Sequence, residues 1–371
     1  MAPALAIAPD RSSPAGLQTA IVTLKVTGQS PVPSSFQPTA ERGKPTRCRT
    51  PRLSVVIVNY RQWEGTANLV GQVRRAPCSR RGEVEVMVVD NHSAAHRLGR
   101  RLRRTPGVSL RRWGSNRGFA RAVNEGGRLS QGEWLLLLNP DVTIPDHFIQ
   151  GVLALVDELS AHQPRAGIVG FHLRNGNGSR QCSTGPFPTL LRTLTGLLRP
   201  RARRKYSLCQ ARERCQVPWA TGCCLLIRQE CLRDLGGLDG DFFLYYEDVD
   251  LCRRARNRGW SVWYEPHLEV VHHQPLHSRD VPAHLRLVTR HSLLHYARKH
   301  WPRWQLWFLT GVVRIEARLR RWWSWLQGNP EAAACFKEMG ALAADMAQES
   351  WAAARSRVRN IVRRAELKCA S

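Results

Sequence analysis

The chain has 371 residues, of which 43% are hydrophobic, and it carries a formal net charge of +27. This length and apolar fraction predict one large domain or two with a sizeable core, and they exclude a wholly disordered chain. Such a positive charge indicates an anionic partner, namely nucleic acid, acidic lipid or a phosphorylated substrate. The 11 cysteines form no CxxC pair, which is typical of reduced thiols in a cytosolic protein. We recognise no signal peptide and no apolar run of about 20 residues, so no membrane span is predicted.

Strands and helices alternate after a polar start. Residues 1–52 are rich in Ala, Pro, Ser, Thr and Gln, which predicts a disordered basic extension. Three apolar runs then predict buried parallel strands: residues 53–60 (LSVVIVNY), 84–93 (VEVMVVDNHS) and 133–145 (EWLLLLNPDVTIP). Residues 108–116 (VSLRRWGSN) predict a further, shorter strand. Helices are predicted over residues 63–75 and 118–130, the second of them beginning at Gly118. This alternation predicts right-handed βαβ units and an α/β fold with a mostly parallel sheet flanked by helices.

The second half of the chain continues the pattern and then changes. A helix capped by Asp146 precedes a strand at residues 166–173, and residues 174–217 form a basic insertion, which we place on the acceptor side. The elements predicted next are a strand and a helix within residues 218–240, a helix from about Glu247 to Gly259, and two short strands at residues 261–266 and 267–273. From about residue 281 the chain is helical and rich in Arg and Trp. We therefore expect an α/β domain over residues 53–280 and a helical C-terminal region over residues 281–371.

Polar and acidic side chains follow three of the predicted strands. They are Asn59 and Tyr60 after the first strand, Asp90 and Asn91 after the second, and Asn139 and Asp141 after the fourth. Pro140 cannot continue a central strand, so these side chains should meet at the carboxyl edge of the sheet, where open α/β folds bind ligands. A carboxylate there can hold Mg²⁺ or Mn²⁺ against substrate phosphates. The alternative is that these residues only form turns that close the strands.

The common nucleotide-binding motifs are not found, so a nucleotide would have to bind through other groups. No G-x-G-x-x-G follows the first strand and no P-loop lysine motif is present, which argues against a dinucleotide dehydrogenase or a P-loop NTPase. Asp90 can accept hydrogen bonds from a base N–H or a ribose hydroxyl. Arg117, which follows Asn116, and the helix that begins at Gly118 supply cationic and backbone donors for phosphates.

A second acidic cluster, Glu247-Asp248-Val249-Asp250, begins a predicted helix. The apolar FFLYY before it and the arginines after it indicate partial burial among cations, where an acid can act as a general base. The alternative is a charged helix N-terminus. His272 ends a strand and could add an imidazole nitrogen to a metal at Asp141, although a histidine there is also common as a structural residue.

Taken in order, these motifs resemble the inverting GT-A glycosyltransferases of family 2, in particular the bacterial rhamnosyltransferase-like branch. The resemblance covers residues 53–300 and is carried by seven segments in the family's order and spacing: SVVIVNY, VMVVDNHS, SNRGFARAVNEG, LLLLNPDV, TGCCLLIR, GGLDGDFFLYYEDVDLCRRARNRGW and VVHH. It implies a single displacement at the sugar C1 of a nucleotide-diphosphate sugar by a hydroxyl of a glycan or lipid-linked glycan acceptor. It favours rhamnose and leaves open UDP-galactofuranose and UDP-N-acetylglucosamine as donors.

The resemblance also implies roles for individual residues. Asp248, with Glu247 beside it, matches the catalytic base. Asp141 matches the metal carboxylate, in an Asn-Pro-Asp that stands where other members have Asp-x-Asp, and His272 matches the metal-proximal histidine. The expected donor-binding residues are Asn59, Tyr60, Asp90, Asn91, Asn116, Arg117, Gly118 and Asn139. The expected cofactor is Mg²⁺ or Mn²⁺.

The positive charge suggests two further kinds of partner, nucleic acid and an anionic membrane. A basic nucleic-acid-binding protein would interleave basic and aromatic residues across its core, whereas here basic residues collect at residues 100–104, in the insertion and in the C-terminal helices. We therefore expect no nucleic-acid partner. Residues 303–327 combine Trp and Arg at helical spacing, which predicts a helix at the interface of an anionic membrane, on the cytoplasmic side. The alternative is a helix packed on the catalytic domain.

Overall fold

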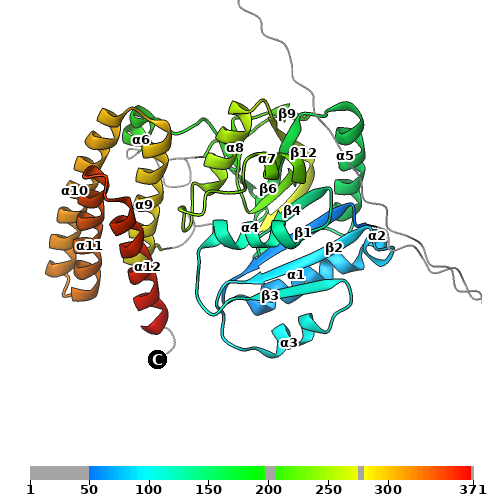
Figure 1. The fold of residues 1–371 in the computed structure, drawn as a ribbon, viewed down its shortest axis with the longest axis horizontal. Helices are drawn as coiled ribbons and strands as arrows, with labels where there is room; N and C mark the ends of the chain where they lie inside the picture. The colour runs from blue at the N-terminus through cyan, green and yellow to red at the C-terminus, as the bar shows by residue number, and fades with distance from the viewer. Residues whose placement is uncertain (1–49, 197–205, 275–279, 369–371) are drawn as a thin grey trace, which may run out of the picture. The chain divides into compact units, whose positions relative to one another are not determined.

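The computed structural model describes residues 50–196, 206–274 and 280–368 (Figure 1). Most of the expected N-terminal extension, and the basic run at residues 199–205, lie outside the described residues. Among the described residues, the apolar runs form a 10-stranded sheet of β1 (Leu53–Asn59), β2 (Val84–Asp90), β3 (Val108–Arg112), β4 (Trp134–Leu138), β5 (Val142–Thr143), β6 (Ala166–Asn175), β7 (Arg180–Gln181), β9 (Cys215–Gln216), β11 (Cys224–Arg228) and β12 (Ser261–His272). A small second sheet pairs β8 (Thr184–Gly185) with β10 (Trp219–Ala220).

The main sheet has the order β3-β2-β1-β4-β11-β6-β12-β5. Strands β3, β2, β1 and β4 are parallel neighbours, as are β6 and β12. Strand β11 lies between these two groups and is antiparallel to both of its neighbours. The α/β architecture expected of a GT-A fold, with a mainly parallel sheet flanked by helices, is therefore confirmed, with β11 as an antiparallel insertion.

Both faces of the central strands are buried, which explains why their sequences are continuously apolar. Val56 and Leu135 pack into the core on one face, while Val55 and Leu136 pack into the core on the other. Helices α1 (Trp63–Arg75) and α5 (Phe148–His162) contribute to the second core, and α4 (Phe119–Leu129) and α8 (Glu247–Asn257) contribute to the first. Shorter helices complete the α/β body: α2 (Pro77–Arg80), α3 (Arg97–Arg103), α6 (Leu190–Gly196) and α7 (Gln229–Asp234).

Two local predictions are wrong. The two short strands expected at residues 261–266 and 267–273 are one strand, β12, whose pairing with β6 shifts register between Glu265 and Glu269. The apparent break at Pro266 is thus an irregularity within a strand. Asp146 does not cap α5, because His147 occupies the N-cap position without a side-chain cap.

The C-terminal region is helical, as predicted, with α9 (Ala283–His300), α10 (Arg303–Leu326), α11 (Pro330–Ala347) and α12 (Trp351–Lys368). Apolar residues of all four helices join the core that contains α4 and α8, and Figure 1 shows the helices stacked beside α8. Residues from Cys48 onward form one compact unit, and the division expected near residue 280 stays a prediction. None of the helices in the described part of the chain combines the length and the apolar character needed to cross a bilayer.

Candidate active site

A cavity of about 680 Å³ opens at the carboxyl ends of β1 and β4. Segments far apart in the chain line it, including the loops after β1 and β4, the start of α8, the end of β12, and parts of α9 and α12. Most of the predicted site residues lie in its wall: Tyr60, Asn91, Asn116, Gly118, Asn139, Asp141, Glu247, Asp248 and His272. Asn59, Asp90 and Arg117 are not among the lining residues.

Asp90 and Asn59 lie in the core behind this wall. Both side chains are fully buried, and their Cα atoms pair directly across β1 and β2. Asn59 Nδ2 donates to Asp90 Oδ1 at 2.8 Å, and Arg112 Nε donates to Asp90 Oδ2 at 2.8 Å. Protein groups therefore donate to both carboxylate oxygens of Asp90. These bonds connect the ends of neighbouring strands. Arg117 lies over the ring of Trp113, with 4.8 Å between its guanidinium carbon and the ring centre.

A network of amides shapes the part of the wall where a nucleotide was expected. Asn91 donates to Asn116 Oδ1 at 2.9 Å and accepts from the backbone N–H of Arg117 at 2.8 Å. Gly118 has φ +88°, and a Cβ there would come within 2.7 Å of the carbonyl oxygen of Phe243. Only glycine fits this conformation and this close approach. The start of α4 is thereby held against the loop that precedes α8.

Residues Asn139 to Asp141, which follow β4, and the end of β12 lie together in another part of the cavity wall. Strand β5 pairs with β12, and the backbone N–H of His273 donates to the carbonyl of Asp141 at 2.9 Å. This pairing brings His272 Nε2 within 3.4 Å of Asp141 Oδ2. Gln181 Nε2 lies 3.0 Å from the other ring nitrogen, Nδ1. Asn139 Oδ1 is buried and accepts no hydrogen bond from the described residues.

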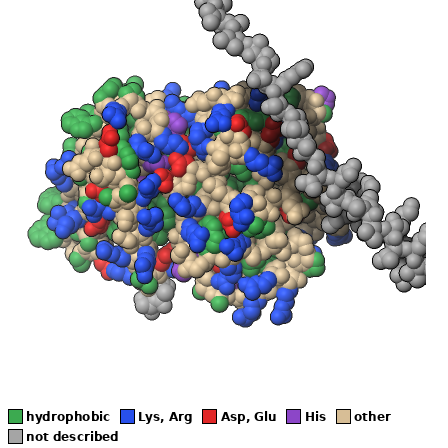
Figure 2. Space-filling view, in the orientation of Figure 1, with side chains coloured by type: hydrophobic (Ala, Val, Ile, Leu, Met, Phe, Trp, Pro, Cys, Tyr) green, Lys and Arg blue, Asp and Glu red, His purple; other side chains and the backbone are tan. Residues whose placement is uncertain are grey.

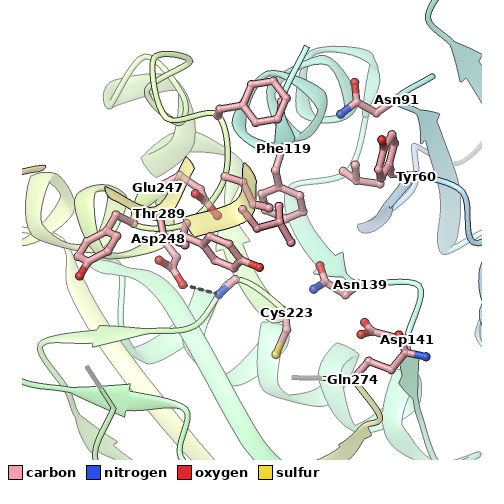
Figure 3. Close-up of a pocket in the computed structure, with 18 of the residues that line it drawn as sticks. Tyr60, Asn91, Phe119, Asn139, Asp141, Cys223, Glu247, Asp248, Gln274 and Thr289 are labelled. Carbon is pink, nitrogen blue, oxygen red and sulfur yellow. Dashed lines mark hydrogen bonds between the residues drawn. The ribbon is translucent and has the colours of Figure 1, made fainter. Parts of the chain in front are cut away.

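The acidic cluster enters the cavity after a strained turn. Tyr245 and Tyr246 have φ +72° and +70°, a left-handed conformation that costs about 1–3 kcal/mol each in a non-glycine residue. Helix α8 then begins at Glu247, and Asp248 is 7% exposed. Asp248 Oδ1 accepts from the backbone N–H of Val249 at 2.8 Å. Its Oδ2 accepts from the backbone N–H of Gly222 at 3.1 Å, the bond that is dashed in Figure 3. These bonds fix the orientation of the carboxylate.

Asp250, in the same cluster, faces away from the cavity wall and has a structural role. Its carboxylate pairs with Arg254 at 2.7 Å, Lys299 at 2.7 Å and His300 at 2.8 Å. Burial alone raises the pKa of a carboxyl, but the His300 hydrogen bond and the two cationic charges lower the pKa of Asp250 to about 2. The residue joins α8 to α9 as a charged cluster.

Sequence reasoning missed a cysteine between the two acidic walls. In Figure 3, Cys223 lies between Asp248 on one side and Asn139 and Asp141 on the other. Burial, together with the charges of Asp141 and Asp248, raises the pKa of the Cys223 thiol well above its ordinary value. A thiol held neutral in this way is a poor nucleophile. The signal in the sequence was the Gly-Cys-Cys at the start of β11, next to the end of β4.

A group of potential metal ligands lies outside the cavity wall. Ligand atoms of Asp239, Asp241 and His295 lie within 4.8 Å of one another. Lys299 Nζ pairs with Asp239 at 2.7 Å, and Arg355 pairs with Asp241. Protein cations therefore already neutralise both carboxylates, and the group connects α9 and α12 to the loop before α8.

Comparisons with known proteins found one matching family model and several similar proteins. The model of the family described as glycosyltransferase like family 2 matches residues 51–298. The N-acetylglucosaminyl-diphospho-decaprenol L-rhamnosyltransferase of Mycobacterium tuberculosis is 30% identical over 261 residues, which cover 64% of this chain and 83% of that protein. The low-salt glycan biosynthesis hexosyltransferase Agl10 of Haloferax volcanii is 28% identical over 242 residues, covering 60% and 68% of the two chains. Among solved structures, the mannosyltransferase PcManGT of Pyrobaculum calidifontis, in complex with GDP-Man and Mn²⁺, matches with a TM-score of 0.45 and 18% identity, over 85% and 86% of the chains.

Proposed function

The chain belongs to the glycosyltransferase like family 2, and on that basis we propose that it transfers a sugar, with rhamnose favoured, from a nucleotide-diphosphate sugar to a hydroxyl of a lipid-linked glycan. The observation that carries the proposal is one cavity whose wall contains the buried carboxylate of Asp248 and, across from it, Asn139 and Asp141, with His272 beside Asp141. The choice of sugar and acceptor draws on the mycobacterial relative, whose name specifies an L-rhamnosyltransferase and a diphospho-decaprenol acceptor.

In this proposal Asp248 is the general base of a single displacement. The acceptor oxygen attacks C1 of the sugar while the bond from C1 to the diphosphate oxygen breaks, and the hydroxyl proton moves to the Asp248 carboxylate. Each Asp248 oxygen accepts one backbone N–H, which fixes the orientation of the carboxylate in the cavity wall. No protein nucleophile is needed, and the neutral thiol of Cys223 fits this route. Glu247, also in the wall, would help to position the acceptor.

The opposite edge of the cavity fits a divalent cation. Asp141 offers a carboxylate, His272 an imidazole nitrogen, and Asn139 a buried oxygen to which no described residue donates a hydrogen bond. This set suits Mg²⁺ or Mn²⁺. Within the described ranges, Gln181 Oε1 is also buried without a partner. A turn of this amide would let Oε1 accept from Nδ1–H of His272, which would leave the lone pair of His272 Nε2 for the cation. When bound, the cation would neutralise the diphosphate leaving group.

The remaining wall would bind the nucleoside part of the donor. Tyr60 and Asn91 lie on the far side of the cavity from Glu247 and Asp248 (Figure 3). The Asn91, Asn116 and Gly118 network offers amide groups there. We assign Asn59 and Asp90 to supporting this wall from behind, because their polar atoms bond to each other and to Arg112. UDP-galactofuranose and UDP-N-acetylglucosamine stay as alternative donors.

A donor screen with the purified full-length chain tests the proposed function. We expect slow hydrolysis or transfer with one nucleotide-diphosphate sugar in the presence of Mn²⁺, and proton NMR should show that the sugar product has the anomeric configuration opposite to that of the donor. Asp248→Asn should lose the reaction, whereas Glu230→Gln, which changes an exposed acid on α7, should retain it. Retention of the anomeric configuration, or full activity of Asp248→Asn, would contradict the proposed mechanism.

A lipid-linked acceptor requires the enzyme to work at a membrane surface, and α10 supplies a suitable face. Its Trp304, Trp307 and Trp325 are 64%, 70% and 71% exposed. The opposite side of the helix, including Leu309 and Val313, is buried in the core. Figure 2 shows hydrophobic side chains gathered with Lys and Arg at the edge of the molecule where α10 lies. Soluble monomers rarely expose so many large apolar side chains together.

Basic residues on this face of α10 favour an anionic membrane. Arg314, Arg318 and Arg321 are exposed beside the tryptophans. Each basic residue near an anionic surface contributes about 1 kcal/mol of attraction, which salt screens. Tryptophan rings beside arginines are typical of a helix that lies in the interface. We therefore propose peripheral attachment of α10 to an anionic membrane, on the cytoplasmic side.

Vesicle sedimentation tests the attachment. The parent should bind phosphatidylglycerol vesicles at low salt, bind less at high salt, and ignore neutral phosphatidylcholine vesicles. The triple variant W304S/W307S/W325S should lose binding, whereas Leu191→Ser, which removes a 72% exposed side chain on α6, should keep it. Equal binding by the triple variant and the parent would show that another surface attaches the protein.

A further inference from the structure

The last helix of the chain enters the nucleoside end of the cavity. Val362, Ala365 and Glu366 of α12 are part of the cavity wall. Glu366 lies 306 residues after Tyr60 and 250 residues after Asn116 in sequence, and it contacts both of their side chains. Arg61 Nη2 also donates to the backbone carbonyl of Glu366, at 3.2 Å. The end of α12 is thus fixed to the loop after β1 and to the residues before α4.

The two side-chain hydrogen bonds end on the same carboxylate oxygen. Tyr60 Oη donates to Glu366 Oε1 at 2.8 Å, and Asn116 Nδ2 donates to the same oxygen at 2.8 Å. Among the described residues, no protein group donates a hydrogen bond to the other oxygen, Oε2. A carboxylate has about four acceptor positions. Glu366 therefore brings a fixed, partly unused acceptor into the wall of the cavity.

The chemistry of a carboxylate limits what it can bind there. It accepts hydrogen bonds and donates none, and its charge repels a diphosphate. A nucleotide-diphosphate sugar carries no cationic group, so it can offer this carboxylate only neutral N–H and O–H groups. Burial and the nearby Glu366 raise the pKa of Tyr60 to about 12, so the phenol keeps the proton that it donates. The neutral donors of a nucleotide-diphosphate sugar at this end are the base N–H and the hydroxyls of the nucleoside.

We propose that Glu366 binds the nucleoside of the sugar donor, with Oε2 accepting a hydrogen bond from the base imide or from a nucleoside hydroxyl. The inference rests on the proposed function, which supplies the nucleotide, and it adds the C-terminal helix to the donor site. It also gives α12 a role in the choice of donor, because a nucleoside without a suitable N–H or O–H loses this contact. The acceptor side of the reaction is unaffected.

Calorimetry on the full-length chain with Mn²⁺ tests this inference. Uridine diphosphate and thymidine diphosphate are titrated separately; both carry the imide N–H and the 3′-hydroxyl, and only the first carries the 2′-hydroxyl. Glu366→Gln keeps an oxygen for Tyr60 and Asn116 and removes the charge, so α12 should stay in place. A hydrogen bond to a charged group contributes about 1.5–3 kcal/mol, which corresponds to a loss of about 10- to 100-fold in affinity.

Controls separate this effect from a loosened helix. Arg364→Ala alters an exposed residue on the same helix and should bind both nucleotides like the parent. Inorganic pyrophosphate with Mn²⁺ should bind Glu366→Gln as it binds the parent, because it lacks the nucleoside. A loss of affinity for thymidine diphosphate as well as uridine diphosphate assigns the contact to the imide or the 3′-hydroxyl. A loss confined to uridine diphosphate assigns it to the 2′-hydroxyl.

Four results would overturn the inference. Unchanged nucleotide affinity in Glu366→Gln would show that the carboxylate does not touch the nucleoside. Tighter binding would show that Glu366 blocks the site, and an equal loss for pyrophosphate would show that the substitution only disturbs the fold. If the parent itself binds no nucleoside diphosphate, including guanosine diphosphate, the proposed function fails and this inference fails with it.

Discussion

Replacing Asp248 by Asn should remove transfer while leaving a folded protein that still binds the donor. Asparagine has the size of aspartate, so the shape of the cavity is kept, but its amide does not accept the acceptor's proton. Loss of a general base costs about 10²–10⁴-fold in rate. That range corresponds to about 3–5 kcal/mol in the activation barrier.

The structure also predicts a cost in stability. The two carboxylate oxygens of Asp248 accept from the backbone N–H groups of Val249 and Gly222, at 2.8 and 3.1 Å. An amide has one oxygen, so it can accept from only one of these groups, and the other N–H then faces an NH₂ donor. Leaving that buried N–H without an acceptor costs about 1–3 kcal/mol in the free energy of unfolding. Urea unfolding measures this loss independently of activity.

The assay is single-turnover transfer at saturating donor and acceptor, with donor affinity measured by calorimetry. Glu247→Gln, at the neighbouring position in the cavity wall, is the matched comparison and should lose much less rate than Asp248→Asn. The reasoning is refuted if Asp248→Asn turns over nearly as fast as the parent, or if Glu247→Gln is the slower variant. A rate loss that simply follows a loss of folded protein would also refute it.

Asp141→Ala should weaken binding of the nucleotide sugar with Mn²⁺ far more than in EDTA, and equal losses in the two calorimetric titrations would make Asp141 structural. Gly118→Ala should destabilise the protein and weaken donor binding, because its Cβ would come within 2.7 Å of the Phe243 carbonyl oxygen at a φ of +88°; unchanged urea unfolding would contradict this. Burial raises the pKa of Glu316, but the hydrogen bond and charge of Arg290 lower it to about 2, from an ordinary 4.5. The stability that this shift contributes is present above pH 4.5 and is lost as the pH falls towards 2, so Glu316→Gln should cost on the order of 3 kcal/mol at pH 7 and clearly less at pH 3. A cost that does not change with pH would show that the shift is absent.

The sequence by itself determined the framework of the site. The strands that end at Asn59 and Asp90, and the leucine strand that ends before Asn139, are continuous apolar runs, and such runs are strong local signals. Pro140 marked the end of β4, and the parallel order of β1, β2 and β4 placed the strand ends at one edge. The helix over residues 63–75 and the helix that begins at Glu247 were likewise predicted from local patterns.

Tertiary structure decided which polar atoms face the cavity. Asp90 and Asn91 are adjacent in sequence, yet Asp90 is fully buried against Arg112 while Asn91 lies in the wall. Asp90 is the last residue of β2 and Asn91 follows it, so the strands beside Asp90 and the loop after it decide which side chain reaches the cavity. Cys223 entered the site because β11 runs antiparallel beside β4, a pairing that no local pattern announces.

In the C-terminal helices too, local sequence patterns did not predict which residues would meet distant parts of the chain. Periodicity located apolar and basic residues on α10, but only packing decided that Leu309 faces the core and Trp307 faces outward. The charged residues of α12 carry no local sign that Glu366 would meet Tyr60, 306 residues earlier in the chain. Local patterns report how a segment buries its own apolar face, whereas a contact between distant segments depends on how complete elements pack. For this protein, the sequence therefore specified the strand edge and its acids, and the fold alone specified the groups that close the cavity around them.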